Sequence, residues 1–109
     1  MSYFFKVTEP EKATEQLKSS YAILESMFLV VPKVFVAQSL RPDLLEPMVT
    51  YVKRLMVETH ALPRRTKELI AAYVSKVNAC AYWVDAHSAM AMAQGLTREE
   101  VQSILDDID

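Results

Sequence analysis

Glycine is almost absent from this chain, and its scarcity restricts the folds that the chain can adopt. One glycine, Gly95, occurs among 109 residues. Tight hairpins in β-rich proteins need glycine where the backbone takes a positive φ, whereas short connections between helices need less of it. The sequence therefore predicts an all-α fold, for which we expect about six helices.

Proline and capping signals place the first helices. Thr8 followed by Glu11 forms the pattern of a capping box, with Pro10 in the first turn, where its missing N–H costs nothing. Pro32 and Pro42 are also suited to the first turns of helices. We expect the first three helices to span residues 8–28, 32–40 and 42–60.

The second half of the chain carries its own punctuation. Pro63 opens a fourth helix, and Asn78 is a suitable N-cap for a fifth helix that begins near residue 79. Gly95 stands where a residue in the left-handed region would end that fifth helix. Thr97 with Glu100 is a second capping box, which opens a last helix toward residue 105.

Apolar residues recur at spacings of three and four along these helices, which indicates faces that pack into a core. The fifth helix is rich in alanine, and small side chains permit close packing of helices. The predicted buried positions are Leu17, Tyr21, Leu24 and Phe28 in the first helix, Leu44, Leu45, Met48, Val52, Leu55 and Met56 in the third, and Leu69, Ile70, Tyr73, Val74 and Val77 in the fourth.

Composition and charge exclude several classes of protein. The formal net charge is −2 and no basic block stands out, so we expect no nucleic-acid partner. The chain has no apolar run of about eighteen residues and no signal-peptide pattern, so we expect no membrane span and a cytoplasmic location. The length fits a single domain over residues 1–109.

Cysteine and histidine counts limit the redox and metal chemistry. The single cysteine, Cys80, can form no intrachain disulfide. Cys80, His60 and His87 do not stand at the spacing of metal ligands, so we expect no metal and no cofactor. Cys80 is then a small hydrophobic residue, a reactive thiol or a link to another chain.

The segment from Glu68 to His87 holds the candidate chemistry. Cys80 falls at the start of a predicted helix, where backbone N–H groups and the helix dipole favour a thiolate. Residue 83 and His87 are four apart and share a helix face. If the fourth and fifth helices pack antiparallel, Glu68 comes within reach of His87, and such a pair would support acid–base work.

These residues also carry a family resemblance. Glu68, Cys80 and His87 match the alkylhydroperoxidase-D pattern, which has Glu, eleven residues, Cys, two residues, Cys, three residues and His. The segments 31–35, 41–45, 78–82, 87–89 and 95–100 look similar too. The chain therefore resembles the alkylhydroperoxidase-D-like and carboxymuconolactone decarboxylase family, in its peroxidase-related branch, over most of residues 25–105. One departure stands out, because Trp83 occupies the position of the second cysteine.

The resemblance implies an alkylhydroperoxidase-D-like helical bundle and a homo-oligomer, most often a trimer or hexamer. It also implies an antioxidant thiol peroxidase, in which a thiol at position 83 attacks the peroxide. An indole cannot do so, and we expect an altered or weakened activity in which Cys80 is the redox thiol. An external thiol would resolve it, and Glu68 and His87 would relay protons.

Two other functions stay open. One is a carboxymuconolactone decarboxylase-like lyase, in which His87 and Glu68 serve as acid and base and Arg64 or Arg65 holds a substrate carboxylate. The other is a non-catalytic member of the family, in which the motif residues only pack.

Some residues are expected to line the site or to contact a neighbouring subunit without taking part in the chemistry. We expect Trp83 and Tyr82 to line the pocket, or to belong to the core. The apolar N-terminal segment Tyr3–Phe5 is a hypothetical docking element for a neighbouring subunit, because a chain this short has little interior for its 51% of hydrophobic residues.

Overall fold

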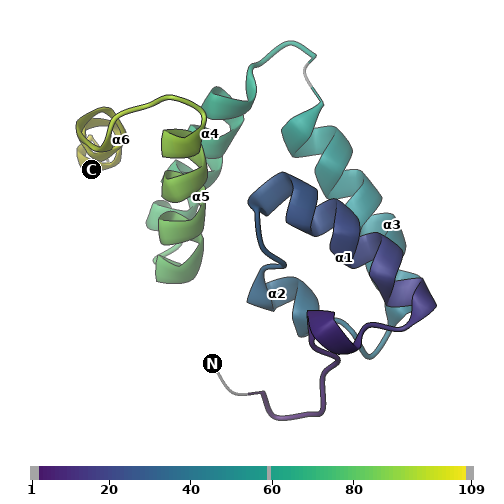
Figure 1. The fold of residues 1–109 in the computed structure, drawn as a ribbon. Helices are drawn as coiled ribbons and strands as arrows, with labels where there is room; N and C mark the ends of the chain where they lie inside the picture. Colours follow the sequence, from purple (N-terminus) through teal and green to yellow (C-terminus); the bar gives the residue numbers. More distant parts are fainter. Residues whose placement is uncertain (1–2, 59, 108–109) are drawn as a thin grey trace. The chain divides into compact units, whose positions relative to one another are not determined.

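The protein is all-α, as the sequence predicts, with six α-helices in the described part of the chain. The structure is a computed structural model that describes residues 3–58 and 60–107, and Figure 1 shows its helices. The fold divides into two compact units, Met1–Val57 and Glu58–Asp109. Each unit has a hydrophobic cluster of its own, and the prediction of a single domain over the whole chain stays a prediction.

Unit 1 is built from three α-helices and two short irregular helices. The α-helices are α1 (Glu15–Phe28), α2 (Lys33–Val36) and α3 (Pro42–Val52), and the irregular ones are a 3₁₀ turn, η1 (Pro10–Lys12), and a π-helix, η2 (Lys53–Val57). The expected short helix over residues 32–40 ends at Val36 and continues as turns.

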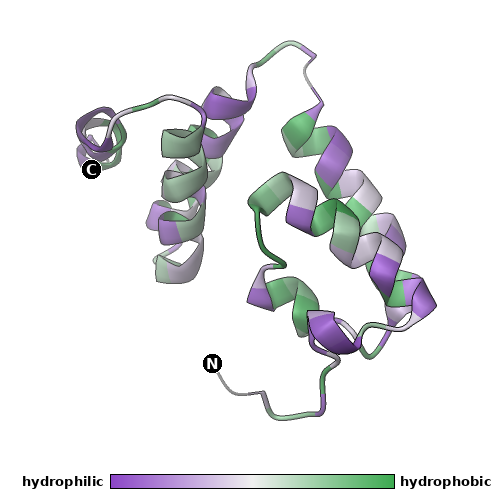
Figure 2. Cartoon of the chain, viewed as in Figure 1, coloured by the Kyte–Doolittle hydropathy of each residue, from purple (hydrophilic) through white to green (hydrophobic). Residues whose placement is uncertain are grey.

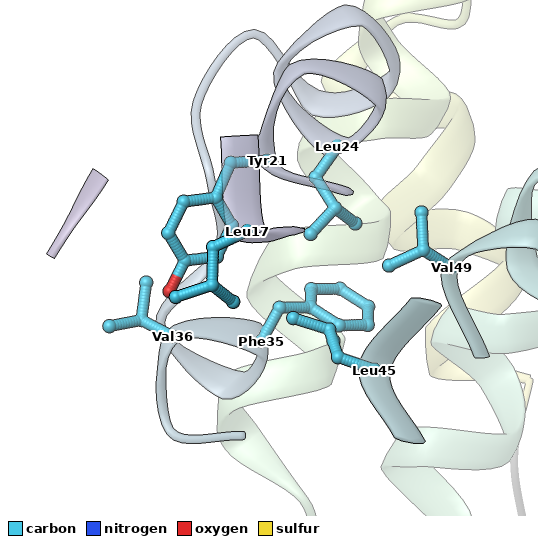
Figure 3. Close-up of a cluster of buried hydrophobic side chains, with 7 residues drawn as sticks. All are labelled: Leu17, Tyr21, Leu24, Phe35, Val36, Leu45 and Val49. Carbon is cyan, nitrogen blue, oxygen red and sulfur yellow. The ribbon is translucent and has the colours of Figure 1, made fainter. Parts of the chain in front are cut away.

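The core of unit 1 lies where α1, α2 and α3 meet. Figure 3 shows side chains from all three helices pointing toward one another around the Phe35 ring. Burying aliphatic and aromatic side chains in this way stabilises a fold by about 1.5–3 kcal/mol for each side chain. The buried residues of this cluster are Leu17, Tyr21, Leu24, Phe35, Val36, Leu45 and Val49.

The predicted start of the first helix at Thr8 is wrong. The Thr8 N–H donates to Ser39 Oγ at 2.8 Å, and its carbonyl accepts from the Tyr21 hydroxyl at 2.7 Å. These contacts bind Thr8 to distant parts of the chain, so the segment reaches only a 3₁₀ turn and α1 begins at Glu15. Local capping is thereby replaced by tertiary hydrogen bonds.

The predicted buried face of α3 is partly wrong as well. Leu45 is buried, and Met48 and Val52 pack against the core, but Leu44 and Leu55 are exposed. The backbone changes to a π-helix at Lys53, which rotates later side chains away from the direction that an α-helix would give them. The predicted end of this helix near residues 59 and 60 is wrong, because the helical backbone ends at Val57; Thr59 itself lies outside the described residues.

Unit 2 consists of α4 (Arg64–Val77), α5 (Ala81–Ala93) and α6 (Arg98–Asp106). Helices α4 and α5 pack along each other, and Ala72 and Ala91 are fully buried between the elements of this unit. Figure 2 shows that α5 is mostly hydrophobic, while α6 carries a hydrophobic and a hydrophilic side. Small side chains let the α4 and α5 backbones approach closely, as their alanine content predicts.

The predicted inward face of α4 is mostly wrong. Leu69 packs against the unit 2 cluster, whereas Ile70, Tyr73, Val74 and Val77 are exposed. The residues of α4 that are buried are Glu68 and Ala72. The hydrophobic pattern therefore identified the wrong side of the helix, because the buried side is centred on a charged residue.

Helix α4 ends at a residue in the left-handed region. In α4, the Ala79 N–H bonds to Lys76 O and the Cys80 N–H bonds to Ser75 O, with Ala79 in the left-handed region at φ 54°. This is a Schellman ending, and Asn78 is therefore the C-cap of α4 and not the predicted N-cap of α5. Cys80 is the N-cap of α5.

Two other predicted boundaries in unit 2 are confirmed. Gly95 has φ 105° and ends α5 through bonds from the Gly95 and Leu96 N–H groups to the last turn. Thr97 Oγ1 accepts from the Glu100 N–H at 3.1 Å, which is the cap expected for α6.

In the described residues, no helix is long and apolar enough to cross a membrane.

Ala79 gives a direct test of the α4–α5 turn. An L-residue in the left-handed region costs roughly 1–2 kcal/mol, which glycine avoids. We expect Ala79→Gly to raise the free energy of unfolding by about 1 kcal/mol, measured by urea denaturation. The matched change Ala89→Gly, in the exposed middle of α5, should lower it by roughly 0.5–1 kcal/mol. A loss of stability in Ala79→Gly would contradict this turn geometry.

Candidate active site

Glu68 is the centre of the candidate site. Its side chain is 0% exposed, and it extends from the side of α4 that faces α5. One carboxylate oxygen, Oε1, accepts from Arg64 Nε at 3.3 Å. The other, Oε2, lies 2.7 Å from His87 Nδ1. The contact that the sequence predicts between Glu68 and His87 is therefore present.

Burial makes these two partners of Glu68 necessary. A carboxylate moved out of water without compensation is strongly unfavourable, and buried charges are accordingly paired. Arg64 carries a permanent positive charge, and its side chain is 15% exposed. An ionised Glu68 only accepts hydrogen bonds, so beside it Nδ1 of His87 is the donor. In neutral His87 the other nitrogen, Nε2, then carries a lone pair.

Arg64 comes from the first turn of α4, four residues before Glu68, so the two share a helix face. Its Nη2 also lies 3.5 Å from Met90 Sδ on α5. No sequence signal marks Met90 as a neighbour of the site. Arg65, the other predicted carboxylate-binding residue, is exposed.

Aromatic rings cover the imidazole. Trp83 stacks on His87 with a centroid separation of 5.0 Å and an interplanar angle of 24°. The Tyr82 ring packs edge to face on Trp83, with a centroid separation of 4.9 Å. An indole therefore lies beside the imidazole. Whether Trp83 and Tyr82 line a substrate pocket stays a prediction.

Cys80 is the third predicted site residue, and it lies at the N-cap of α5. Its side chain is half-buried, and its carbonyl accepts from the Val84 N–H at 3.1 Å. Cys80 and His87 are seven residues apart, or about 10 Å along the helix axis. Among the described residues, no hydrogen bond joins the thiol to Glu68 or His87.

Two further features bear on what the site can hold. Ser88 follows His87 in the sequence, and its Oγ is buried without a hydrogen-bond partner among the residues that the structure describes. No sequence pattern marked it. In the part of the chain that the structure describes, no three His, Cys, Asp or Glu side chains come together as metal ligands would.

Comparisons with known proteins agree with this picture. The model of the carboxymuconolactone decarboxylase family matches residues 42–108. The crystal structure of the alkylhydroperoxidase AhpD core from Rhodospirillum rubrum superposes with a TM-score of 0.80 at 24% identity, over 95% of this chain and 82% of that one. That likeness concerns the fold. A search of curated proteins gives no match. The chain belongs to the carboxymuconolactone decarboxylase family.

Proposed function

We propose that this protein is a cofactor-independent lyase that decarboxylates a small carboxylated lactone, with His87 as the group that transfers the proton. The observation that carries the proposal is the 2.7 Å contact between His87 Nδ1 and the buried Oε2 of Glu68. A carboxylate that holds one imidazole nitrogen fixes the tautomer and leaves the other nitrogen for acid–base chemistry.

The proposed reaction breaks one carbon–carbon bond and moves one proton. The substrate carboxylate leaves as carbon dioxide, and the electron pair of the broken bond passes into the lactone ring as an enolate. Nε2 of His87 takes a proton from water, which is left as hydroxide, and transfers that proton to a ring carbon, which neutralises the enolate. Glu68 keeps the imidazole oriented and balances its positive charge while it holds the proton.

Variants separate this mechanism from thiol chemistry. Proton transfer by a placed side chain typically contributes 10²–10⁴-fold, so we expect His87→Ala to lower kcat for decarboxylation by roughly 100-fold or more. Cys80→Ser should retain the activity, because the thiol takes no part in the reaction. The measurement is the loss of lactone absorbance together with release of carbon dioxide.

The matched control for this test is His60→Ala, which removes the other histidine at an exposed position. It should leave kcat unchanged. Full decarboxylation in His87→Ala, or its loss in Cys80→Ser, would rule out the proposed roles. Absence of any activity, together with a large fall in melting temperature for Glu68→Gln, would support a non-catalytic protein.

A thiol peroxidase is the second candidate, and the position of Cys80 at the N-cap of α5 favours it. The N-terminus of a helix stabilises a thiolate, which is the nucleophilic form of cysteine. The thiolate would attack one peroxide oxygen, break the O–O bond and leave an alcohol and a sulfenic acid. One external thiol would then form a mixed disulfide with release of water, and a second would regenerate Cys80.

Peroxide consumption with an external thiol tests this second candidate. We expect turnover to vanish in Cys80→Ser and to remain in Ser75→Ala, a nearby change that leaves the thiol in place. Equal turnover in Cys80→Ser would refute a thiol mechanism outright.

We also propose that the protein forms a homo-oligomer, which the exposed apolar side chains support. Phe4 is completely exposed, and the apolar side chains of Ile70, Val74 and Val77 on α4 are 49%, 50% and 59% exposed. Large exposed apolar surfaces commonly mark contacts with other chains.

Deletion of residues 1–6 tests the N-terminal docking segment in this assembly. The deletion removes Phe4, Phe5 and Lys6, together with Tyr3, whose hydroxyl donates to the Lys33 carbonyl at 3.2 Å. It also removes residues 1 and 2, which lie outside the described residues. We expect a smaller particle mass by light scattering, since interface aromatic residues often dominate the binding energy. Lys6→Ala is the matched control, and an unchanged mass after the deletion would exclude this segment from the contact.

A further inference from the structure

We propose that Arg64 is a positioning residue that sets how tightly the Glu68–His87 pair holds a proton, and that it does not bind substrate. This inference rests on the proposed proton transfer at His87. Arg64 Nε lies 3.3 Å from Glu68 Oε1, on the oxygen that His87 does not use. The three side chains thus form one chain from guanidinium to carboxylate to imidazole, at 15%, 0% and 15% exposure.

The charges of this trio explain the resting state. Arg64 is always positive, so Arg64 with an ionised Glu68 and a neutral His87 sums to zero. A neutral sum is the favoured state for groups removed from water. At rest, therefore, Nε2 of His87 carries no proton. Once His87 takes up a proton the trio carries one net positive charge, and the proton is readily given to a substrate.

Removing the positive charge of Arg64 makes the state with one extra proton on Glu68 or His87 the favoured one. The buried pair of Glu68 and neutral His87 then carries one net negative charge, and uptake of a proton restores neutrality. That proton yields either an ionised Glu68 with a cationic His87, or a neutral Glu68 that donates to Nδ1. In both forms Nε2 of His87 carries a proton at rest. Either form is a poorer proton carrier than the native trio.

Other charged groups of unit 2 are engaged elsewhere or lie on other faces. Lys67 Nζ donates to the Glu58 carbonyl, and Lys76 Nζ lies 3.8 Å from Asp106 Oδ1. Asp85 is exposed and stands two residues before His87, which places it across α5. The remaining charged residues on these helices are Arg65, Arg98, Glu99 and Glu100, all exposed, and in the described residues no ion pair joins any of them to Glu68 or His87.

Substitutions at Arg64 and its neighbour Arg65 test the charge argument. Nitrogen NMR of histidine-labelled protein reports which imidazole nitrogen carries a proton, and only two histidines contribute signals. His60→Gln identifies the His87 signals. At neutral pH we expect Nε2 of His87 to be unprotonated in the native protein and protonated in Arg64→Met. The matched control Arg65→Met should keep the native pattern.

Two more variants keep the test decisive if Arg64→Met does not fold. Arg64→Lys keeps the charge, so Nε2 should stay unprotonated. Arg64→Met combined with Glu68→Gln removes both charges, so nothing then favours a second proton on the imidazole, and His87 should be neutral with one protonated nitrogen. An unprotonated Nε2 in folded Arg64→Met, or a protonated one in Arg64→Lys, would overturn the proposal.

Kinetics separate a positioning role from substrate binding. We expect Arg64→Met to lower kcat for lactone decarboxylation on the order of 10-fold with little change in KM, and Arg64→Lys to restore most of it. A raised KM with unchanged kcat would instead assign Arg64 to the substrate carboxylate. If the native protein does not decarboxylate lactones but the NMR results hold, the proposed function fails and the role of Arg64 stands.

Discussion

The carboxylate of Glu68 is the feature on which the rest of unit 2 depends. A fully buried charge is tolerated only with partners, and its two oxygens are shared between Arg64 and His87. Because His87 belongs to α5, this contact fixes the register of α5 along α4. The buried Ala72 and Ala91 let the two helices come close enough for it to form. Packing and candidate chemistry are therefore set by the same interface.

The same constraint explains where sequence reasoning succeeded and where it failed. In α1, Leu17, Tyr21 and Leu24 are buried as their spacing predicts, because that helix packs with an apolar face. In α4 the spacing predicted the opposite side, since a hydrophobic count gives no weight to a charged residue. Only the spacing of Glu68 and His87 indicated an inward carboxylate. A pairing between helices, such as this one, cannot be read from the periodicity of one helix.

Capping shows a similar division between local and distant interactions. The cap at Thr97 was predictable because its hydroxyl bonds to a backbone N–H three residues away. The same pattern at Thr8 failed, since Ser39 and Tyr21 bind its backbone groups from far along the chain. The proximity of Arg64 to Met90, which are 26 residues apart, was beyond sequence reasoning for the same reason.

Trp83 and Glu68 hold the His87 ring from two sides. The indole stacks on the face of His87 while Glu68 holds Nδ1, so two sides of the imidazole are occupied by fixed partners. Nε2 is the remaining polar atom of the ring and the natural point of proton exchange. Cys80 lies two helical turns away at the N-cap of α5. The contact between Glu68 and His87 therefore needs no thiol to stay intact, and the tryptophan at position 83 leaves that contact in place.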